Sequence, residues 1–183
     1  MNNISNELAK CTVKTIDDEL IPFSSLYTGH TTFIFFVRHF GCIFCRERVS
    51  SLRNALTLLE SHQFRACVVG NGTPNAAADF VDHLELPFPV YCDREGHAYR
   101  LAGMQRNFGL NLSSVKDAWR SYQSGHRQNK PAGDVWQQGG VIVVTPNGQV
   151  LATIADQSAG DYIDIPDLVA SLTQNKEHKD IAV

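Results

Sequence analysis

The chain carries one continuous apolar run, Thr32–Val37, followed by a segment with a different spacing of apolar residues. The run is rich in β-branched and aromatic side chains and predicts a buried strand. Gly41 then allows a sharp turn. From Cys42 to Glu60 the apolar positions fall on one helical face: Val49, Leu52, Ala55, Leu56 and Leu59. We therefore expect a buried strand, a turn and an amphipathic helix in succession.

The rest of the chain alternates strands and helices and then forms a hairpin. Thr73 suits the N-cap, and Pro74 the first turn, of a helix from about Asn75 to His83. The turn Thr145–Gly148 contains Asn-Gly and predicts an antiparallel hairpin. The other expected elements are an edge strand at Cys11–Ile16, strands at Phe64–Gly70 and Val90–Cys92, a helix at His97–Leu101, hairpin strands at Val141–Val144 and Val150–Ile154, and a closing helix at Asp167–Leu172.

This order of elements indicates the fold class. Strands and helices joined by short links imply parallel strands with right-handed crossovers. With the hairpin and last helix added, the order predicts an α/β thioredoxin-like fold, in which helices flank a central mixed sheet. We expect one domain over residues 1–183, with an insertion at 104–138 before the hairpin and a polar tail at 174–183. The insertion contains an expected short helix and either packs on the surface or covers the cysteines.

The amino-acid composition argues against several classes of protein. Hydrophobic residues make up 43% of the chain and charged residues 19%, as in ordinary soluble proteins. The net charge of −3 argues against a nucleic-acid partner. No apolar run is long enough to span a membrane, and we expect no secretory signal. Five cysteines do not suggest a disulfide framework, so we expect a reducing, cytoplasmic location.

The strongest chemical signal is the pair Cys42 and Cys45 at the start of the first long helix. Free N–H groups and the positive end of the helix dipole favour a thiolate there. Arg38, Arg46 and Arg48 add positive charge. Thiols in such settings have pKa values of roughly 3.5–7.5. One thiolate can attack a substrate, and the second cysteine can resolve the product.

Two other interpretations of the pair remain. A zinc site needs about four ligands, and only His39 lies close in sequence. The two cysteines could also fill a hydrophobic core, because free cysteine is often buried and inert. Their position at a helix start among arginines favours a redox pair. We expect neither a metal site nor a cofactor.

Three segments together carry a family resemblance: Phe36–Glu47, Pro87–Gly96 and Gly133–Gly140. They resemble the peroxiredoxin-like 2 branch of the alkyl hydroperoxide reductase / thiol-specific antioxidant superfamily. The similarity covers about residues 12–172 in order. It implies a thioredoxin-like fold and thiol-based redox chemistry.

The resemblance leaves two alignments of the active-site cysteine open. Typical peroxiredoxins carry Pro-x-x-x-Thr-x-x-Cys. With Cys45 on that cysteine, Arg38 and Cys42 replace the proline and threonine. With Cys42 there, Phe35 and His39 stand at those positions. We expect Cys42 to attack and Cys45 to resolve, because the first cysteine of such a helix is usually the more exposed.

Other residues are expected near the thiols. Arg38 is the candidate to hold the thiolate and polarise a peroxide oxygen, and its alternative is a surface ion pair. His39 is either a proton shuttle near neutral pH or a solvated loop residue. Gly139 and Gly140 stand where thioredoxins place a cis-proline, which would leave open backbone beside the thiols. The resemblance also places Trp136 and Gln137 near the site, so the expected substrate-binding residues are His39, Phe40, Trp136, Gln137, Gly139 and Gly140.

These observations lead to two hypotheses about function. The first is a thiol-dependent oxidoreductase that reduces a peroxide, a disulfide, or a quinone-like or endoperoxide substrate. Its expected partners are that small oxidised substrate and a thiol reductant such as thioredoxin, glutaredoxin or glutathione, and we allow for a homodimer. The alternative is a non-catalytic thioredoxin-fold redox sensor or binding module. The two differ in turnover, because a sensor changes state only once.

Overall fold

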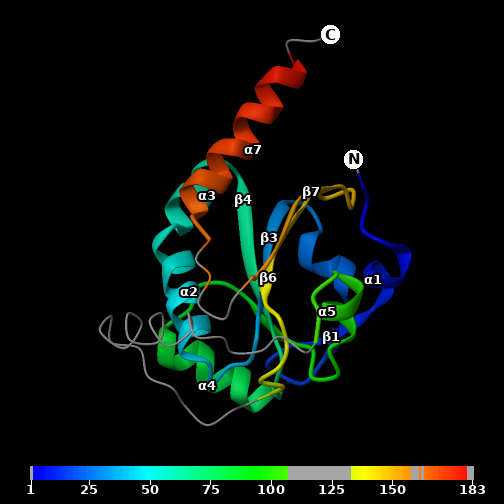
Figure 1. Ribbon diagram of the computed structural model, residues 1–183, viewed down its shortest axis with the longest axis vertical. Helices are drawn as coiled ribbons and strands as arrows, with labels where there is room; N and C mark the ends of the chain where they lie inside the picture. The colour runs from blue at the N-terminus through cyan, green and yellow to red at the C-terminus, as the bar shows by residue number, and fades with distance from the viewer. Residues whose placement is uncertain (1, 107–132, 158–160, 162, 181–183) are drawn as a thin grey trace.

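A computed structural model describes residues 2–106, 133–157, 161 and 163–180, the last six by backbone alone (Figure 1). The strands are β1 (Thr12–Lys14), β2 (Leu20–Pro22), β3 (Thr31–Val37), β4 (Phe64–Gly70), β5 (Val90–Cys92), β6 (Gly140–Val144) and β7 (Val150–Ala155). The helices are α1 (Asn6–Lys10), the 3-10 helix η1 (Phe23–Tyr27), α2 (Ile43–Asn54), α3 (Leu56–Ser61), α4 (Pro74–Leu84), α5 (His97–Leu101) and α7 (Ile165–Asp180).

The strands form a seven-stranded sheet in the order β2-β1-β5-β4-β3-β6-β7. β3 lies inside it, parallel to β4 and antiparallel to β6. β7 is antiparallel to β6 and therefore runs in the same direction as β3. The carboxyl ends of β3, β4 and β7 thus meet at one edge of the sheet, where α2 and α4 begin. The predicted central mixed sheet flanked by helices is confirmed.

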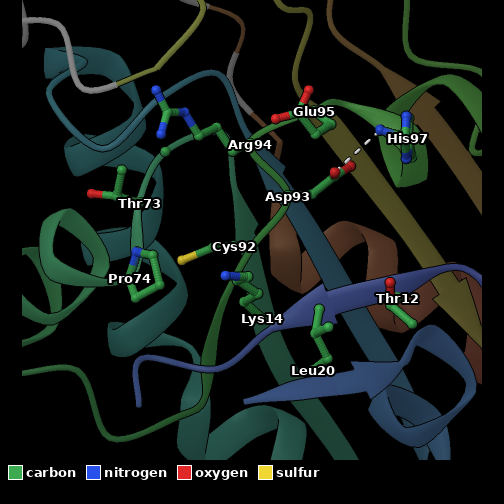
Figure 2. Close-up of a pocket in the computed structure, with 11 residues that line it drawn as sticks. Thr12, Lys14, Leu20, Thr73, Pro74, Cys92, Asp93, Arg94, Glu95 and His97 are labelled. Carbon is green, nitrogen blue, oxygen red and sulfur yellow. Dashed lines mark hydrogen bonds between the residues drawn. The ribbon is translucent and has the colours of Figure 1, made fainter. Parts of the chain in front are cut away.

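Several predicted elements are present with close to their expected bounds. The hairpin of β6 and β7 turns at Gly148, whose φ of +84° requires the conformational freedom of glycine. Thr73 caps α4 by accepting a hydrogen bond from the Ala76 N–H at 3.3 Å. Pro74 is the first residue of that helix. Figure 2 shows Thr73 and Pro74 across a pocket from Lys14 and Cys92.

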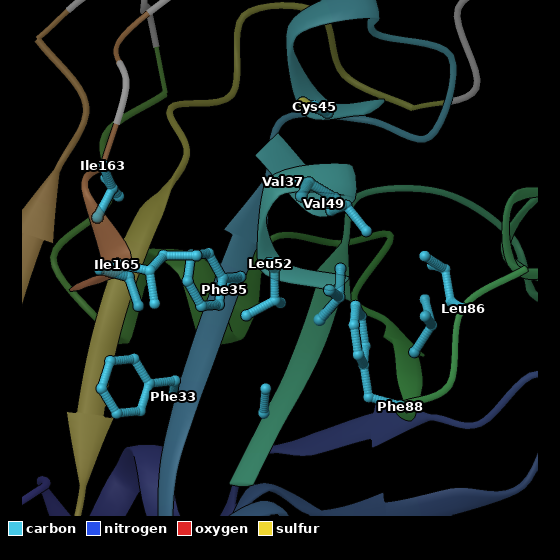
Figure 3. Packing of buried hydrophobic residues seen from close by; sticks show 14 of the residues in the cluster. Phe33, Phe35, Val37, Cys45, Val49, Leu52, Leu86, Phe88, Ile163 and Ile165 are labelled. Atoms are coloured by element: carbon cyan, nitrogen blue, oxygen red, sulfur yellow. The ribbon is translucent and has the colours of Figure 1, made fainter. Parts of the chain in front are cut away.

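Two hydrophobic clusters lie on opposite faces of the sheet, because side chains alternate along β3. Phe33, Phe35 and Val37 face α2, α3, α4 and α7. Ile34 and Phe36 face α1, η1 and α5. Figure 3 shows Cys45 at the end of the first cluster, beyond Val37 and Val49. The two cysteines therefore sit where the core meets the carboxyl edge of the sheet.

Three expectations about element bounds were wrong. The expected edge strand Cys11–Ile16 is shorter and lies inside the sheet, because β2 pairs with it and forms the edge. The polar sequence of residues 1–10 predicts a loosely held segment, but the structure has α1 there, and its N-cap Ser5 and buried Leu8 fix it. The helix expected from Cys42 to Glu60 is divided at Ala55 into α2 and α3.

The end of the chain also differs from the expectation. The closing helix α7 continues past Leu172 to Asp180, into the expected polar tail. Most of the expected insertion at 104–138, including its helix around Trp119, lies outside the described residues. Among the helices that are described, none is both long and apolar enough to cross a membrane.

Candidate active site

The turn after β3 positions Cys42 as the N-cap of α2 and Cys45 in its first turn. The Cys42 N–H donates a hydrogen bond to the His39 carbonyl at 3.1 Å, which closes the turn. Cys42 is 2% exposed and Cys45 5% exposed, so both thiols are buried, and Cys42 is not the more exposed cysteine that was expected. The Cys42 side chain makes no capping hydrogen bond in its thiol form, but the N–H groups of Phe44 and Cys45 in the first turn favour its thiolate form.

Cys42 has the environment of a reactive thiol. A hydrogen bond from the Cys45 thiol is the largest effect that lowers its pKa, to about 6. Burial opposes this shift, while the Arg38 charge and the backbone N–H groups of Cys45 and Phe44 reinforce it. Cys42 is therefore a thiolate at neutral pH.

Cys45 has the opposite environment. Burial, the hydrogen bond it donates to Cys42 and the Cys42 charge raise its pKa well above the usual value. The backbone N–H of Arg38 donates to its Sγ at 3.2 Å. Arg48 acts in the other direction and lowers the pKa of Cys45. The pair thus consists of a thiolate and a thiol that shares its proton with the thiolate.

Arg38 is buried at 4% exposure, so it is not a surface ion pair. Its Nε donates to the Gln137 carbonyl at 3.3 Å, and its Nη2 donates to the Val135 carbonyl. Its charge contributes to lowering the Cys42 pKa. Arg38 therefore stabilises the thiolate and at the same time binds the segment that precedes β6.

That segment, Gly133–Gly139, is held beside the cysteines by further bonds. The Asp134 N–H donates to Asn71 Oδ1 at 2.6 Å, and its carboxylate forms an ion pair with Arg106. Gly133 has φ +139°, and a Cβ there would lie 1.9 Å from the Asn71 carbonyl oxygen. The close approach requires glycine. Asn71, the residue directly after β4, is a positioning residue that was not predicted from the sequence.

The expected substrate-binding residues of this region differ in position. Gln137 is buried, and its Nε2 donates to the Gln105 carbonyl at 3.1 Å. Trp136 is 53% exposed at the surface beside it. Phe40 is buried against Phe80, with ring centroids 5.3 Å apart. Phe40 is thus a core residue, and Trp136 is the one with a large surface open to a ligand.

His39 is buried beside the cysteines, and its Nδ1 has no hydrogen-bond partner among the described residues. Burial is the main cause that lowers its pKa to about 4, and Arg38 adds to the shift while Asp134 opposes it. His39 is neutral at pH 7. A pKa this low does not fit the expected proton shuttle near neutral pH, but it leaves a neutral polar atom available to a substrate.

The open backbone expected at Gly139 and Gly140 is not found. A Cβ on Gly139 would lie 2.7 Å from both the Phe36 carbonyl oxygen and Asp156 Oδ2. A Cβ on Gly140 would lie 2.4 Å from the Ile154 carbonyl oxygen. The described residues contain no cis peptide bond. The two glycines permit close packing of strands and side chains instead of exposing backbone.

A buried ion pair next to the cysteines was also missed. Arg48 Nη1 lies 2.8 Å from Asp156 Oδ2, and Arg48 Nη2 donates to the Asp161 carbonyl at 2.7 Å. Asp156 is 2% exposed and follows β7. The position of Asp156 could have been predicted from the sequence. It is the residue after β7, and the residues that follow β7 and β3 lie at the same edge of the sheet.

The other cysteines have raised pKa values. Burial raises the pKa of Cys92 to about 12 and also raises the pKa of Cys67. Burial also raises the pKa of Cys11. All described cysteines are free, and no group of three or more described His, Cys, Asp or Glu side chains could hold a metal ion. Cys42 is thus the cysteine whose surroundings favour a thiolate.

Comparison with known families places this site in context. Residues 51–158 match the family described as AhpC/TSA antioxidant enzyme. The chain belongs to this family. The resemblance inferred from the sequence is confirmed. The matched span begins after Cys42 and Cys45, so the assignment of these two cysteines rests on the geometry above.

Curated relatives support the family at moderate identity. A prostamide/prostaglandin F synthase of Aquarana catesbeiana is 27% identical over 164 residues, covering 86% of this chain and 81% of the relative. A peroxiredoxin-like 2C of Takifugu rubripes is 27% identical, over 79% of this chain and 71% of the relative. A chloroplastic thioredoxin-like protein AAED1 of Arabidopsis thaliana is 27% identical over 82% of this chain and 66% of its own length.

Solved structures confirm the thioredoxin-like fold of the peroxiredoxins. Peroxidoxin BcpB of Mycobacterium tuberculosis superposes with a TM-score of 0.68 at 14% identity, over 95% of this chain and 98% of that one. A PrxQ mutant of Xylella fastidiosa gives a TM-score of 0.65 at 10% identity, over 97% of this chain and 95% of that one. At these identities the likeness concerns the fold alone.

Proposed function

We propose that this family member is a thiol-dependent oxidoreductase in which Cys42 attacks a peroxide and Cys45 resolves the product. The observation that carries the proposal is the lowered pKa of Cys42, about 6, next to a thiol with a raised pKa. Such a pair supplies a nucleophile at neutral pH and a second thiol within bonding reach.

In the first step the Cys42 thiolate attacks one oxygen of the peroxide. An S–O bond forms, the O–O bond breaks, and the leaving alkoxide takes up a proton and departs as an alcohol. Cys42 becomes a sulfenic acid. Arg38, whose charge lowers the Cys42 pKa, is our candidate to polarise the peroxide. The unpartnered His39 Nδ1 is available to hydrogen-bond the same substrate.

In the second step Cys45 attacks the Cys42 sulfur. An S–S bond forms, the S–O bond breaks and water leaves. A thiol reductant such as thioredoxin, glutaredoxin or glutathione then reduces the disulfide and returns both thiols. The cycle requires no cofactor. Other substrates with a weak bond between two heteroatoms, namely a disulfide or an endoperoxide, fit the same chemistry.

A redox sensor remains a second candidate, and the burial of both cysteines favours it. With 2% and 5% exposure, the thiols meet solvent only when neighbouring residues move. A sensor would oxidise once under stress and would not recycle quickly with a reductant. The two functions therefore differ in turnover under excess peroxide and reductant.

Anaerobic titration of the reduced protein tests the proposal. Hydrogen peroxide, an alkyl hydroperoxide and a small disulfide are added in turn, and the oxidised protein is mapped by mass spectrometry. We expect an intramolecular Cys42–Cys45 disulfide and repeated turnover with a thioredoxin system. A link from Cys42 to Cys92, or oxidation without turnover, would contradict the enzymatic proposal.

A further inference from the structure

The buried ion pair of Arg48 and Asp156 has no part in the steps described so far. Arg48 is 9% exposed and lies three residues after Cys45 on α2, so both occupy neighbouring positions on one helical face. Asp156, at the carboxyl end of β7, holds Arg48 Nη1 at 2.8 Å. The Asp161 carbonyl holds Nη2 at 2.7 Å. These bonds fix the guanidinium in place, and its charge acts on the second thiol.

The chain is also shaped to accommodate this pair. A Cβ on Gly139 would lie 2.7 Å from Asp156 Oδ2 and 3.4 Å from Arg48 Nη1. Glycine at this position therefore leaves the room that the ion pair fills. Burying two charges is costly, and hydrophobic residues of similar volume often stabilise a fold equally well. A buried pair beside a reactive site suggests a function beyond stability.

The second thiol needs such a charge. Cys45 is buried and donates its proton toward Cys42, and both facts raise its pKa well above the usual value. A thiol in this state is a weak nucleophile. The groups that act on the charges of the thiol pair come from several elements: Arg48 on α2, Arg38 and His39 after β3, and Tyr99 on α5. Asp156, after β7, acts through its ion pair with Arg48.

Within this set, the positive charge of Arg48 lowers the pKa of Cys45. Arg38 reaches the Cys45 sulfur through its backbone N–H, while its side chain donates to the carbonyls of Val135 and Gln137. The Tyr99 hydroxyl shares its single proton between the carbonyls of Val37 at 2.6 Å and Val69 at 2.9 Å, and burial raises its pKa well above the usual value. It therefore brings no charge to the thiol.

We propose that Arg48, fixed by Asp156, is a positioning residue that stabilises the Cys45 thiolate in the resolving step. This inference rests on the proposed function, because it assigns Cys45 as the resolving thiol. The Cys45 thiolate attacks the sulfur of oxidised Cys42, the S–S bond forms and the S–O bond breaks. Hydroxide leaves and takes up the proton that Cys45 lost, so the net product is one disulfide and one water.

The test measures Cys45 directly, without any peroxide. In a Cys42→Ser background, the ultraviolet thiolate absorbance is titrated against pH, with Cys42→Ser/Cys45→Ser as the blank. We expect Arg48→Met to raise the Cys45 pKa by about one unit, which is a tenfold loss of thiolate below that pKa. Asp156→Asn should act in the opposite direction and lower it by about half a unit, because it leaves the Arg48 charge uncompensated.

The opposite signs distinguish this role from a structural one. Loss of packing would shift both variants in the same direction, toward the pKa of an exposed thiol. Arg48→Lys should retain most of the parent pKa because it keeps the charge. Arg53→Met, which removes an exposed arginine from the last turn of α2, is the matched control and should change nothing.

Each outcome decides the question. The role of Arg48 is contradicted if the Cys45 pKa stays unchanged in Arg48→Met and Asp156→Asn, or if it shifts in the same direction in both. If Arg48→Met does not fold, the Cys45 pKa is compared in Asp156→Asn and Arg48→Lys instead. A raised or constant Cys45 pKa in Asp156→Asn then contradicts the proposed role of Arg48. Failure of the proposed peroxide chemistry would appear separately, as absent turnover in the parent protein with these titrations intact.

Discussion

The starts of α2 and α4 offer a comparison within one molecule. Both helices follow parallel neighbouring strands, β3 and β4, and both begin at the same edge of the sheet. Thr73 caps α4 with its hydroxyl, and Pro74 follows at the first position. Cys42 occupies the equivalent position of α2, and its side chain forms no capping bond.

The difference shows how a structural position becomes a reactive one. At α4 the orphan N–H groups of the first turn are satisfied by a hydroxyl that cannot ionise in this pH range. At α2 the N–H groups of Phe44 and Cys45 instead stabilise a thiolate. A cap residue contributes about 1 kcal/mol to stability. A cysteine at the cap position gives up this stabilisation of the helix but provides a nucleophile.

Cys42→Ser should have the largest effect, because it makes the start of α2 resemble that of α4. We expect peroxide turnover to fall by at least about a thousandfold, since the nucleophile is lost. Serine is a good N-cap, so the free energy of unfolding should stay equal or increase by up to about 1 kcal/mol. Steady-state kinetics and urea unfolding check both parts. Cys42→Ala, without a cap or a nucleophile, is the control and should be less stable than Cys42→Ser.

Arg38→Met should have the next largest effect. It removes a charge that lowers the Cys42 pKa and the two bonds to the Gln137 and Val135 carbonyls. We expect the Cys42 pKa to rise by about one to two units, which lowers the thiolate fraction below that pKa by about 10- to 100-fold. Arg38→Lys should keep a low pKa yet lose most turnover, because lysine lacks the planar fork.

Titration of thiolate absorbance together with peroxide turnover tests Arg38. Arg65→Met is the matched control, because Arg65 is exposed on β4 and lies away from the cysteines. Curves for both Arg38 variants that coincide with the parent would remove Arg38 from the site. A shift in the Arg65→Met curve would mean that removing any positive charge changes the Cys42 pKa, even one distant from the cysteines.

The pH dependence of peroxide consumption should reflect Cys42. The thiolate is the reactive form, so the rate rises with pH, about tenfold per unit below the pKa of about 6, and levels off above it. His39, with a pKa of about 4, adds no step between pH 5 and 8. Stopped-flow rates across this range measure the profile.

The role of the second thiol sharpens this test. Cys45→Ala removes the hydrogen bond that lowers the Cys42 pKa most, so the profile should move to higher pH. Cys45→Ser can still donate a hydrogen bond and should move it less. A profile centred on about 8.5, the value of a free thiol, in the parent protein would contradict the assignment of Cys42.

The sequence predicted what depends on local patterns. β3, the start of α2, the cap of α4 and the Asn-Gly hairpin all follow from residues close together in the chain. The missed features depend on distant residues. β2 is only three residues long, and its apolar pattern is too short to distinguish it from a turn. The role of Asp156 depends on its ion pair with Arg48, which lies far away in the sequence.

The glycines before β6 illustrate the same limit. Gly139 and Gly140 suggested open backbone from the sequence, because a missing side chain gives no information about what fills its place. In the structure, the Asp156 carboxylate and the Ile154 carbonyl fill it. Likewise, Phe40 next to the cysteines suggested substrate contact, whereas it packs against Phe80 and the bare backbone of Gly70.

Thr73→Ala should have the smallest effect and completes the comparison from the α4 side. The substitution removes the hydrogen bond to the Ala76 N–H, so the free energy of unfolding should fall by about 1 kcal/mol. Turnover and the Cys42 pKa should stay unchanged, because this hydrogen bond belongs to the start of α4, whereas the Cys42 pKa depends on Cys45, Arg38 and the Phe44 N–H. Thr73→Ser keeps the hydroxyl and should retain the stability of the parent. If Thr73→Ala instead lowered turnover, the two helix starts would be coupled, and the division between a structural cap and a reactive one would not hold.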